Sequence, residues 1–464
     1  MRSFEQSRIL RRSFSSRILA IRLLPGQVVA LAGGILILLG TGLLMLPIAT
    51  PPHVELRLID ALFTATSAVC VTGLIVLDTP HDFTLFGQLV ILLLIQIGGL
   101  GYALMVTLLL LILGTRIGLR DRMMLAETLS TLDMQGLVRF VKMVALVTFA
   151  TEGLGAVLLT ARFAADTSWG EAIYWGIFHS ISAFNNAGFS LFSTSLSAYQ
   201  TDFLINLIVT TLVILGSIGF IVFQDLWDYM KGARFHLQSH TKLVLVTTVI
   251  ILVIGTLGIL ILEWNNPATF QPLAPSDRLL SSYFHTVSRT SGFTTMDLSD
   301  MRDATLYFLL LLMAIGGSPG SMAGGIKTTT IAVVALTLRS VLRRDEEVEV
   351  FYRRIPQDVV IRALCLCILA LTLITLVTLI LAFIERQPVL SLMFEVTSAM
   401  GIVGMSLGDG ANRSLSALFT DFGKAMMIMS MLLGRFGPLI IGLFAIKTAR
   451  RKRYRFPSAR VIIG

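Results

Sequence analysis

The sequence predicts an all-α membrane protein built from four tandem helix–pore loop–helix repeats, with eight transmembrane helices and four re-entrant pore loops around one central pore. Two observations lead to this fold class. Apolar runs recur along the whole chain of 464 residues, of which 55% are hydrophobic and only 14% charged. In addition, four connections between these runs carry a related segment that ends in glycine and one further residue.

Eight apolar runs are long enough to cross a hydrocarbon core, which takes about 20 residues of α-helix. They are 27–48, 85–113, 140–160, 203–224, 243–262, 304–338, 361–384 and 421–446. The mean hydropathy of +0.82 agrees with a polytopic membrane protein. The first run is longer than the hydrophobic part of a cleaved signal, and no small-residue cleavage site follows it. We therefore expect it to remain as the first span.

The basic residues give the orientation of these spans. The N-terminus, the second, fourth and sixth loops and the C-terminus hold 27 Lys and Arg, whereas the opposite loops hold 7. Because cytoplasmic loops are enriched in Lys and Arg, both termini are predicted to be cytoplasmic, in a cell inner or plasma membrane. The net charge of +9 thus reports topology and gives no case for nucleic acid.

Cysteine usage excludes two further classes of site. The three cysteines, Cys70, Cys365 and Cys367, all lie within predicted membrane segments. Cys365 and Cys367 are two residues apart on a helix and point in different directions. Neither a disulfide framework nor a metal site is expected from this pattern.

The four related segments, called the glycine segments below, indicate internal repetition. They are FTATSAVCVTGL (63–74), FHSISAFNNAGF (178–189), FHTVSRTSGF (284–293) and FEVTSAMGIVGM (394–405). Each begins with Phe and ends in Gly followed by a bulky apolar residue. The glycines Gly73, Gly188, Gly292 and Gly404 are separated by 115, 104 and 112 residues. A recurring spacing of this kind is typical of repeated structural units.

This repetition predicts a division of the chain. We expect a basic cytoplasmic N-terminus (1–24), repeat 1 (25–115), repeat 2 (116–235), repeat 3 (236–345, with an intramembrane loop at 314–327), repeat 4 (346–448) and a cytoplasmic C-terminus (449–464).

Each glycine segment is expected to re-enter the membrane. The part before the glycine is too short to span. Asp60, Glu171 and Asp277 lie near the starts of the first three segments, where an acid complements the positive end of a helix dipole. The chain after each short helix has to return in extended form, which is tolerated at that depth only beside water or inside protein. Four such stretches would present backbone carbonyls that replace the hydration shell of an alkali cation.

A plainer interpretation is that these glycines only let helices pack, as in Ile97-Gly98-Gly99-Leu100-Gly101. One glycine motif would favour packing. Four motifs at the same place in a repeated unit favour a pore instead.

The motifs resemble those of the Trk/Ktr/HKT superfamily of potassium transporters, in its KtrB type of pore subunit. The resemblance is carried by VCVTGL, NNAGF, RTSGF and the Gly-Ile-Val-Gly of the fourth segment, by QIGGLG and GGSPGSMAGGIKTTT, and by LLGRFGP. It implies a homodimer of pores in the lipid bilayer and a cytosolic nucleotide-binding ring subunit (KtrA-type) that gates them. It also implies K+ as the transported ion, held by filter carbonyls. No cofactor is expected on this chain, and the nucleotide is expected on the partner.

The segments and the resemblance together give the expected filter residues: Val69, Cys70, Val71, Thr72, Gly73, Asn185, Asn186, Ala187, Gly188, Arg289, Thr290, Ser291, Gly292, Gly401, Ile402, Val403 and Gly404. For Arg289 we expect bracing of neighbouring loops rather than contact with ions.

The run 304–338 is expected to break. As one helix its 35 residues would measure roughly 52 Å against a hydrocarbon core of about 30 Å. Five of the ten residues 316–325 are glycine, so the break should fall there, facing the pore below the filter, where it would obstruct ions. The resemblance implies an intramembrane gating loop at the same place. The expected gate residues are Gly316, Gly317, Ser318, Pro319, Gly320, Ser321, Gly324, Gly325, Lys327 and Arg435.

Several alternatives accompany this interpretation of the loop. Its GSMAGGIKT differs from a phosphate-binding loop because Ile326 separates Gly325 from Lys327 and no strand precedes it. Lys327 either faces the pore or extends to the cytoplasmic interface. Arg435, near the middle of 421–446, is expected to bind the free carbonyls of the loop, because an arginine at that depth marks a functional site.

The predicted function is a potassium-translocating membrane subunit. A membrane enzyme is disfavoured, because the spans contain no paired carboxylates, metal-ligand cluster or nucleotide loop. A sodium-selective or Na+/K+ co-transporting protein of the same fold is the remaining alternative.

Overall fold

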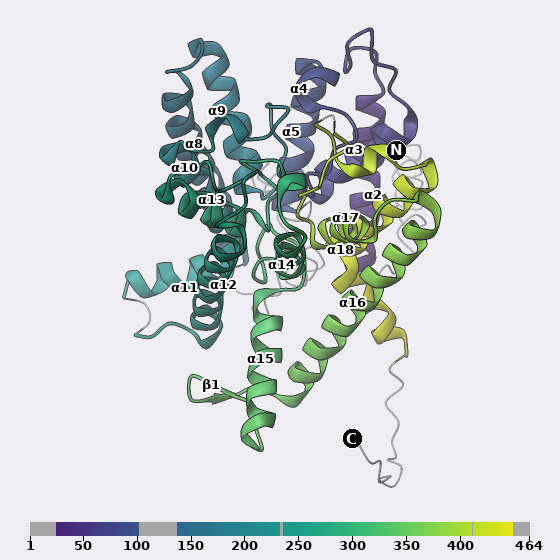
Figure 1. Cartoon of the computed structure of the whole chain (residues 1–464). Helices are drawn as coiled ribbons and strands as arrows, with labels where there is room; N and C mark the ends of the chain where they lie inside the picture. Colours follow the sequence, from purple (N-terminus) through teal and green to yellow (C-terminus); the bar gives the residue numbers. More distant parts are fainter. Residues whose placement is uncertain (1–24, 102–136, 233–234, 411, 449–464) are drawn as a thin grey trace, which may run out of the picture.

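The computed structural model describes residues 25–101, 137–232, 235–410 and 412–448 (Figure 1). The helices in chain order are α2 (Pro25–Leu44), α3 (Leu58–Cys70), α4 (Thr79–Asp82), α5 (Leu85–Leu100), α8 (Leu137–Phe163), α9 (Trp169–Phe184), α10 (Phe203–Ile218), α11 (Phe220–Met230), α12 (Ser239–Glu263), α13 (Pro275–Ser288), α14 (Asp303–Ala314), α15 (Thr328–Arg343), α16 (Gln357–Glu385), α17 (Val389–Gly401) and α18 (Asp421–Thr448). Short 3-10 turns lie at Ser197–Tyr199, Leu298–Asp300 and Leu415–Leu418.

Four short buried helices, α3, α9, α13 and α17, hold the upstream parts of the glycine segments. Asp60, Glu171 and Asp277 lie in the first turns of α3, α9 and α13, as expected from the helix dipole. The phenylalanine that opens each segment anchors its helix in the core. Phe63, Phe178, Phe284 and Phe394 are all fully buried.

Longer helices enclose these four. Among the described residues, three helices are long and apolar enough to cross a membrane, Arg139–Phe163, Ser239–Glu263 and Gln357–Glu385, or four if the bent pair α10–α11 forms one span. Their exposed faces carry large apolar side chains such as Leu146, Ile254 and Leu371, as a lipid-facing surface requires. The part of the expected span 85–113 beyond Gly101 lies outside the described residues, as do the N-terminal segment 1–24 and the C-terminal segment 449–464.

The apolar run 203–224, expected as one span, forms two helices rather than one continuous helix. The chain bends by 92° between α10 and α11. Gly219 at the bend has φ +100°, which a helix excludes, and the Phe220 N–H donates to the Gly320 carbonyl at 3.0 Å. The bend therefore coincides with a glycine and with a contact to a distant part of the chain.

The predicted break in 304–338 lies where glycine content placed it. Helix α14 ends at Ala314 and α15 begins at Thr328. The intervening residues 315–327 are called the glycine-rich loop below. Figure 1 shows α15 and α16 extending together away from the rest of the molecule, with the short antiparallel pair β1 (Glu349–Val350) and β2 (Arg353–Arg354) in the connection between them.

Candidate functional site

The four terminal glycines of the glycine segments form a closed ring. A Cβ added at Gly73 would lie within 3.0 Å of the Ala187 carbonyl oxygen, and one at Gly188 within 3.0 Å of that of Ser291. The same relation holds from Gly292 to the Val403 carbonyl oxygen, and from Gly404 back to that of Thr72. Each segment therefore touches the next one in chain order, and the fourth touches the first.

Glycine is required in this ring for two reasons. The φ angles of Gly73, Gly188, Gly292 and Gly404 are +89°, +69°, +79° and +96°, a region that side chains disfavour. A Cβ would also overlap a carbonyl of the neighbouring segment, because real Cβ atoms do not approach other atoms within 3.0 Å.

The way the short helices end sets the direction of the chain toward the ring. After α3 and α17, the cap residues Val71 and Ile402 are left-handed, with φ +62° and +56°. In the second segment Asn186 has φ +58°. The third segment is two residues shorter and leaves α13 through Arg289 in right-handed conformation. Its shorter sequence thus reflects a different helix end that leads to the same glycine.

A serine hydroxyl braces the chain in every segment. Ser67 and Ser398 accept hydrogen bonds from the N–H groups of Gly73 and Gly404, at 3.1 and 3.0 Å. Ser182 and Ser288 donate to the carbonyls of Phe189 and Phe293, the residues that follow the glycines. These bonds hold the extended stretches against their own helices.

The ring offers carbonyl oxygens rather than carboxylates. Within the part of the chain that the structure describes, no hydrogen bond ends on the carbonyl of Thr72, Ala187, Ser291 or Val403. Groups of three or more His, Cys, Asp or Glu placed to hold a metal ion are likewise absent among the described residues. Neutral backbone oxygens, rather than carboxylates, are the kind of ligand that suits a dehydrated monovalent cation.

The other expected filter residues differ in where they lie and in what they contact. Val69, Cys70 and Gly401 belong to the last turns of α3 and α17 rather than to the extended stretches. The Asn186 side chain accepts a hydrogen bond from the Thr290 hydroxyl at 3.0 Å and so links the second and third segments.

Two side chains of this set point away from the ring. Asn185 directs its amide toward α5 and α8. Arg289 donates from Nη1 to the Ile315 carbonyl, and to that of Gly316 at 3.3 Å.

The glycine-rich loop is held by backbone hydrogen bonds to the end of α10. Ser318 N–H donates to the Ser217 carbonyl at 2.9 Å, and Met322 N–H to that of Gly216 at 3.0 Å. The loop also closes on itself, because Gly316 N–H donates to the Ile326 carbonyl at 2.8 Å. On another side it touches the fourth segment, since a Cβ at Gly324 would overlap the Ile402 side chain.

Arg435 on α18 joins the loop to the end of α5. Its Nη1 donates to the Met322 carbonyl at 2.7 Å, and its Nη2 donates to the carbonyls of Gly98 at 2.6 Å and Gly99 at 3.3 Å. Lys327 bonds within the loop, where Nζ donates to the Ala323 carbonyl at 2.7 Å. The two cations thus satisfy loop carbonyls that have lost helical partners.

The remaining expected gate residues fill the loop. Ser318 shares a hydrogen bond with the Thr328 hydroxyl at 2.8 Å, and Gly320 and Gly325 have φ of +70° and +71°. The Pro319 carbonyl lies against Gly219. Gly317 and Ser321 lie close together, since a Cβ at Gly317 would approach the Ser321 hydroxyl within 3.0 Å.

The glycines at the end of α5 were expected from the sequence to let helices pack, whereas those at the end of α10 were not singled out. A Cβ at Gly98 would overlap the Val69 carbonyl, and one at Gly216 the Phe184 carbonyl. A signal was present, because Gly98–Gly101 and Gly216–Gly219 repeat the same Gly-x-x-Gly spacing at matching places in the first two repeats.

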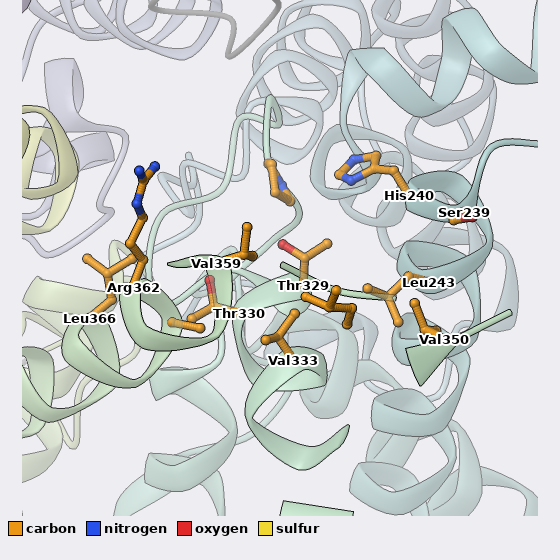
Figure 2. A pocket seen from close by; sticks show the side chains of 13 residues that line it. Ser239, His240, Leu243, Thr329, Thr330, Val333, Val350, Val359, Arg362 and Leu366 are labelled. Atoms are coloured by element: carbon orange, nitrogen blue, oxygen red, sulfur yellow. The ribbon is translucent and has the colours of Figure 1, made fainter. Parts of the chain in front are cut away.

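A cavity of about 420 Å³ lies beside the glycine-rich loop (Figure 2). Its lining is Ser239, His240, Leu243, Pro319, Thr329, Thr330, Val333, Val350, Ile355, Val359, Arg362, Ala363 and Leu366. Aliphatic side chains dominate this wall, and its ionisable groups are His240 and Arg362, neither of them acidic. The cavity is therefore poorly suited to solvate a cation; Pro319 of the loop lines it, and none of the four ring glycines does.

Comparisons with known proteins identify the family and the fold of the chain. A family model described as "TrkH: Cation transport protein" matches residues 27–454. The Ktr system potassium uptake protein B of Bacillus subtilis is 41% identical over 446 residues, which cover 96% of this chain and 98% of that protein. The potassium/sodium uptake protein NtpJ of Enterococcus hirae is 35% identical, with 96% and 98% covered. The crystal structure of the potassium transporter TrkH from Vibrio parahaemolyticus has the same fold, with a TM-score of 0.70 at 22% identity, covering 93% of this chain and 86% of that one.

Proposed function

The chain belongs to the TrkH family of cation transport proteins, and on that premise we propose that it is the potassium-translocating membrane subunit of a K+ uptake system. Membership of a transporter family also confirms the prediction that the protein is not an enzyme. The name of the Bacillus subtilis relative, a potassium uptake protein, supports the choice of ion.

One observation carries the proposal, namely the closed ring of four glycines and neighbouring carbonyls. In the proposed filter, the extended stretches 71–73, 186–188, 290–292 and 402–404 direct carbonyl oxygens at K+. The filter works by replacing the water shell of the ion, so its selectivity depends on the spacing of these oxygens. The four short helices point their C-terminal, negative ends at the same place, which adds to the attraction for a cation.

The glycine-rich loop is the proposed gate. Its contacts with Ile402 on one side and with 216–220 on the other support a place directly under the ring. Since few side chains anchor it, the loop can leave this place by breaking a small number of hydrogen bonds, among them those from Arg289 and Arg435.

The assembly belongs to the same proposal. Four repeats with the boundaries expected from the sequence give eight spans and four pore loops, with both termini on the cytoplasmic side of the cell membrane. Two copies form a homodimer, and a cytosolic nucleotide-binding ring subunit of the KtrA type binds the basic inner face. The words "Ktr system" in the name of a relative support a multi-subunit complex.

A second candidate is a sodium-selective or Na+/K+ co-transporting protein. The Enterococcus hirae relative, named as a potassium/sodium uptake protein, supports it. The two functions share the fold and differ in how the carbonyl ring ranks the ions.

Flux measurements on the purified chain in liposomes test the proposal. K+, Rb+ and Na+ are supplied separately and then in pairs, and uptake is followed against protein-free vesicles. We expect K+ and Rb+ to enter and Na+ to be excluded. Entry of Na+ alone, or of K+ only when Na+ is present, would establish the second candidate, and no cation flux at all would contradict both.

A further inference from the structure

A buried carboxylate behind the second glycine segment is not used by the proposed filter or gate. Glu152 lies in the middle of α8 and is 5% exposed. Its Oε1 accepts from the Asn185 amide nitrogen at 2.9 Å, and its Oε2 accepts from the Gln96 amide nitrogen at 3.2 Å. Asn185 is the residue at which α9 ends, directly before the extended stretch 186–188 of the second segment.

The three side chains form a closed triangle of hydrogen bonds, because the Asn185 amide nitrogen also donates to the Gln96 Oε1 at 3.1 Å. All three residues are less than 10% exposed, so water does not compete for these bonds. On its other side, the Asn185 Oδ1 lies against α5, where a Cβ at Gly99 would overlap it. The triangle therefore ties the end of α9, where the extended stretch of the second segment begins, to both α5 and α8.

We propose that Glu152 is a positioning residue for ion selectivity, which sets the orientation of Asn185 and thereby the path of the second filter stretch. The inference rests on the proposed filter function. Glu152 does not face the ring of carbonyls itself; it acts through Asn185.

The pattern of donors and acceptors requires a carboxylate. The Asn185 amide nitrogen, which also donates to the Ile181 carbonyl of its own helix at 2.9 Å, makes both of the Asn185 contacts in the triangle. Gln96 and residue 152 therefore have to present the same kind of atom to it. The opposite ends of those two side chains then face each other. An amide carries one donor end and one acceptor end, so two amides would oppose two like ends. A carboxylate accepts at both ends and satisfies all three contacts.

This requirement holds for either orientation of the amides. With Glu152→Gln, every combination of amide rotations leaves one donor facing a donor or one acceptor facing an acceptor. A buried polar contact of this kind is costly, so the side chains would move apart. The start of the second filter stretch would then lose its fixed position.

The matched test exchanges the two partners. Glu152→Gln alone should lower the ratio of K+ to Na+ flux in liposomes by roughly 2- to 10-fold, as expected for the loss of one buried hydrogen bond. The double variant Glu152→Gln with Gln96→Glu places the carboxylate, which accepts at both oxygens, at position 96 and the amide at position 152. All three hydrogen bonds of the triangle can then form again, and the amino-acid composition is unchanged. We expect its flux ratio to return to that of the parent.

A second buried carboxylate serves as the control. Glu263 on α12 is fully buried and accepts from Asn266 and Thr269, both at 2.6 Å, and from the Arg302 N–H at 3.0 Å. These partners lie at the end of α12 and in the connections to α13 and α14. Glu263→Gln should lower thermal stability in detergent without changing the flux ratio.

The outcomes separate this inference from the proposed function. A parent protein that does not select K+ would contradict the proposed filter. A selective parent with an equally selective, folded Glu152→Gln variant would overturn the role of Glu152. If Glu152→Gln does not fold, the exchanged pair decides: a folded, selective double variant supports the hydrogen-bond triangle, and a misfolded or unselective one refutes it.

Discussion

A glycine at each of four positions meets two physical needs at once. Gly73, Gly188, Gly292 and Gly404 adopt positive φ, and each leaves room for a carbonyl of the next segment. The first need is a property of the local chain, whereas the second exists only once four distant segments have come together. A side chain at any of the four positions would therefore disturb two segments.

Gly73→Ser should reduce potassium selectivity. Serine in the left-handed region costs about 1–2 kcal/mol, and its Cβ would also push the Ala187 carbonyl out of the ring. We expect the K+ to Na+ flux ratio to fall while both ions still pass. Gly153→Ser on α8 is the matched control, because a Cβ there meets no atom within 4 Å. An unchanged ratio in folded Gly73→Ser protein would rule out Gly73 as a filter residue.

Arg435 could be identified as important from sequence, whereas its second contact could not. A cation in the middle of an apolar run is evident in the sequence, and it points to partners among free carbonyls. That these include Gly98 of α5 as well as Met322 of the loop depends on how α5 and α18 pack. The triangle of Gln96, Glu152 and Asn185 escaped prediction for the same reason, since its members lie on three different elements.

Arg435→Ala should raise potassium flux. The change removes the hydrogen bond to the Met322 carbonyl and with it one restraint on the closed loop. Arg435→Lys provides a graded comparison, because a single ammonium lacks the fork that serves two carbonyl groups. Initial rates of K+ uptake into liposomes should increase from parent to lysine to alanine. A folded alanine variant that conducts no faster than the parent would show that Arg435 does not hold the gate.

Among the elements, continuous and broken helices were predicted with unequal success. The break after α14 follows from composition, because five glycines and a proline cannot continue a helix. The 92° bend after α10 is harder to predict, because residues on both sides of Gly219 bond to the distant loop, among them Phe220 to Gly320 and Ser217 to Ser318. Interruptions caused by local propensity are thus visible in the sequence, whereas those caused by a distant backbone contact are not.

Shortening the glycine-rich loop should open the pore. Deleting residues 318–322 removes the hydrogen bonds from this part of the loop to Ser217 and Gly216 but leaves the ring of carbonyls intact. We expect higher K+ flux with selectivity over Na+ retained. If the glycines served only to pack helices, the deletion would cause misfolding instead. Size-exclusion chromatography and flux on the same sample distinguish these results, and a folded variant with parental flux would show that the loop is not the gate.

Over the whole molecule, charge and repetition were informative in the sequence because both are sums over many residues. The predicted asymmetry, with 27 basic residues on one side and 7 on the other, does not depend on any single contact. The repeat likewise survives large local differences, as the shorter third segment shows with its separate helix end at Arg289. The exact placement of side chains behind the ring is different, because it depends on a few contacts between elements far apart in the chain.

Control by a cytosolic subunit is a property of the complete assembly. In the proposed assembly, the predicted basic inner face would bind a ring that holds nucleotide, and its attraction for an acidic partner should weaken as salt screens the charges. We expect the isolated chain to conduct slowly, and addition of the KtrA-type subunit with its nucleotide to raise K+ flux severalfold. The loop deletion is the internal control, because a pore without its gate should gain little from the partner. Full flux from the isolated chain, unchanged when the partner is added, would refute regulation by the ring.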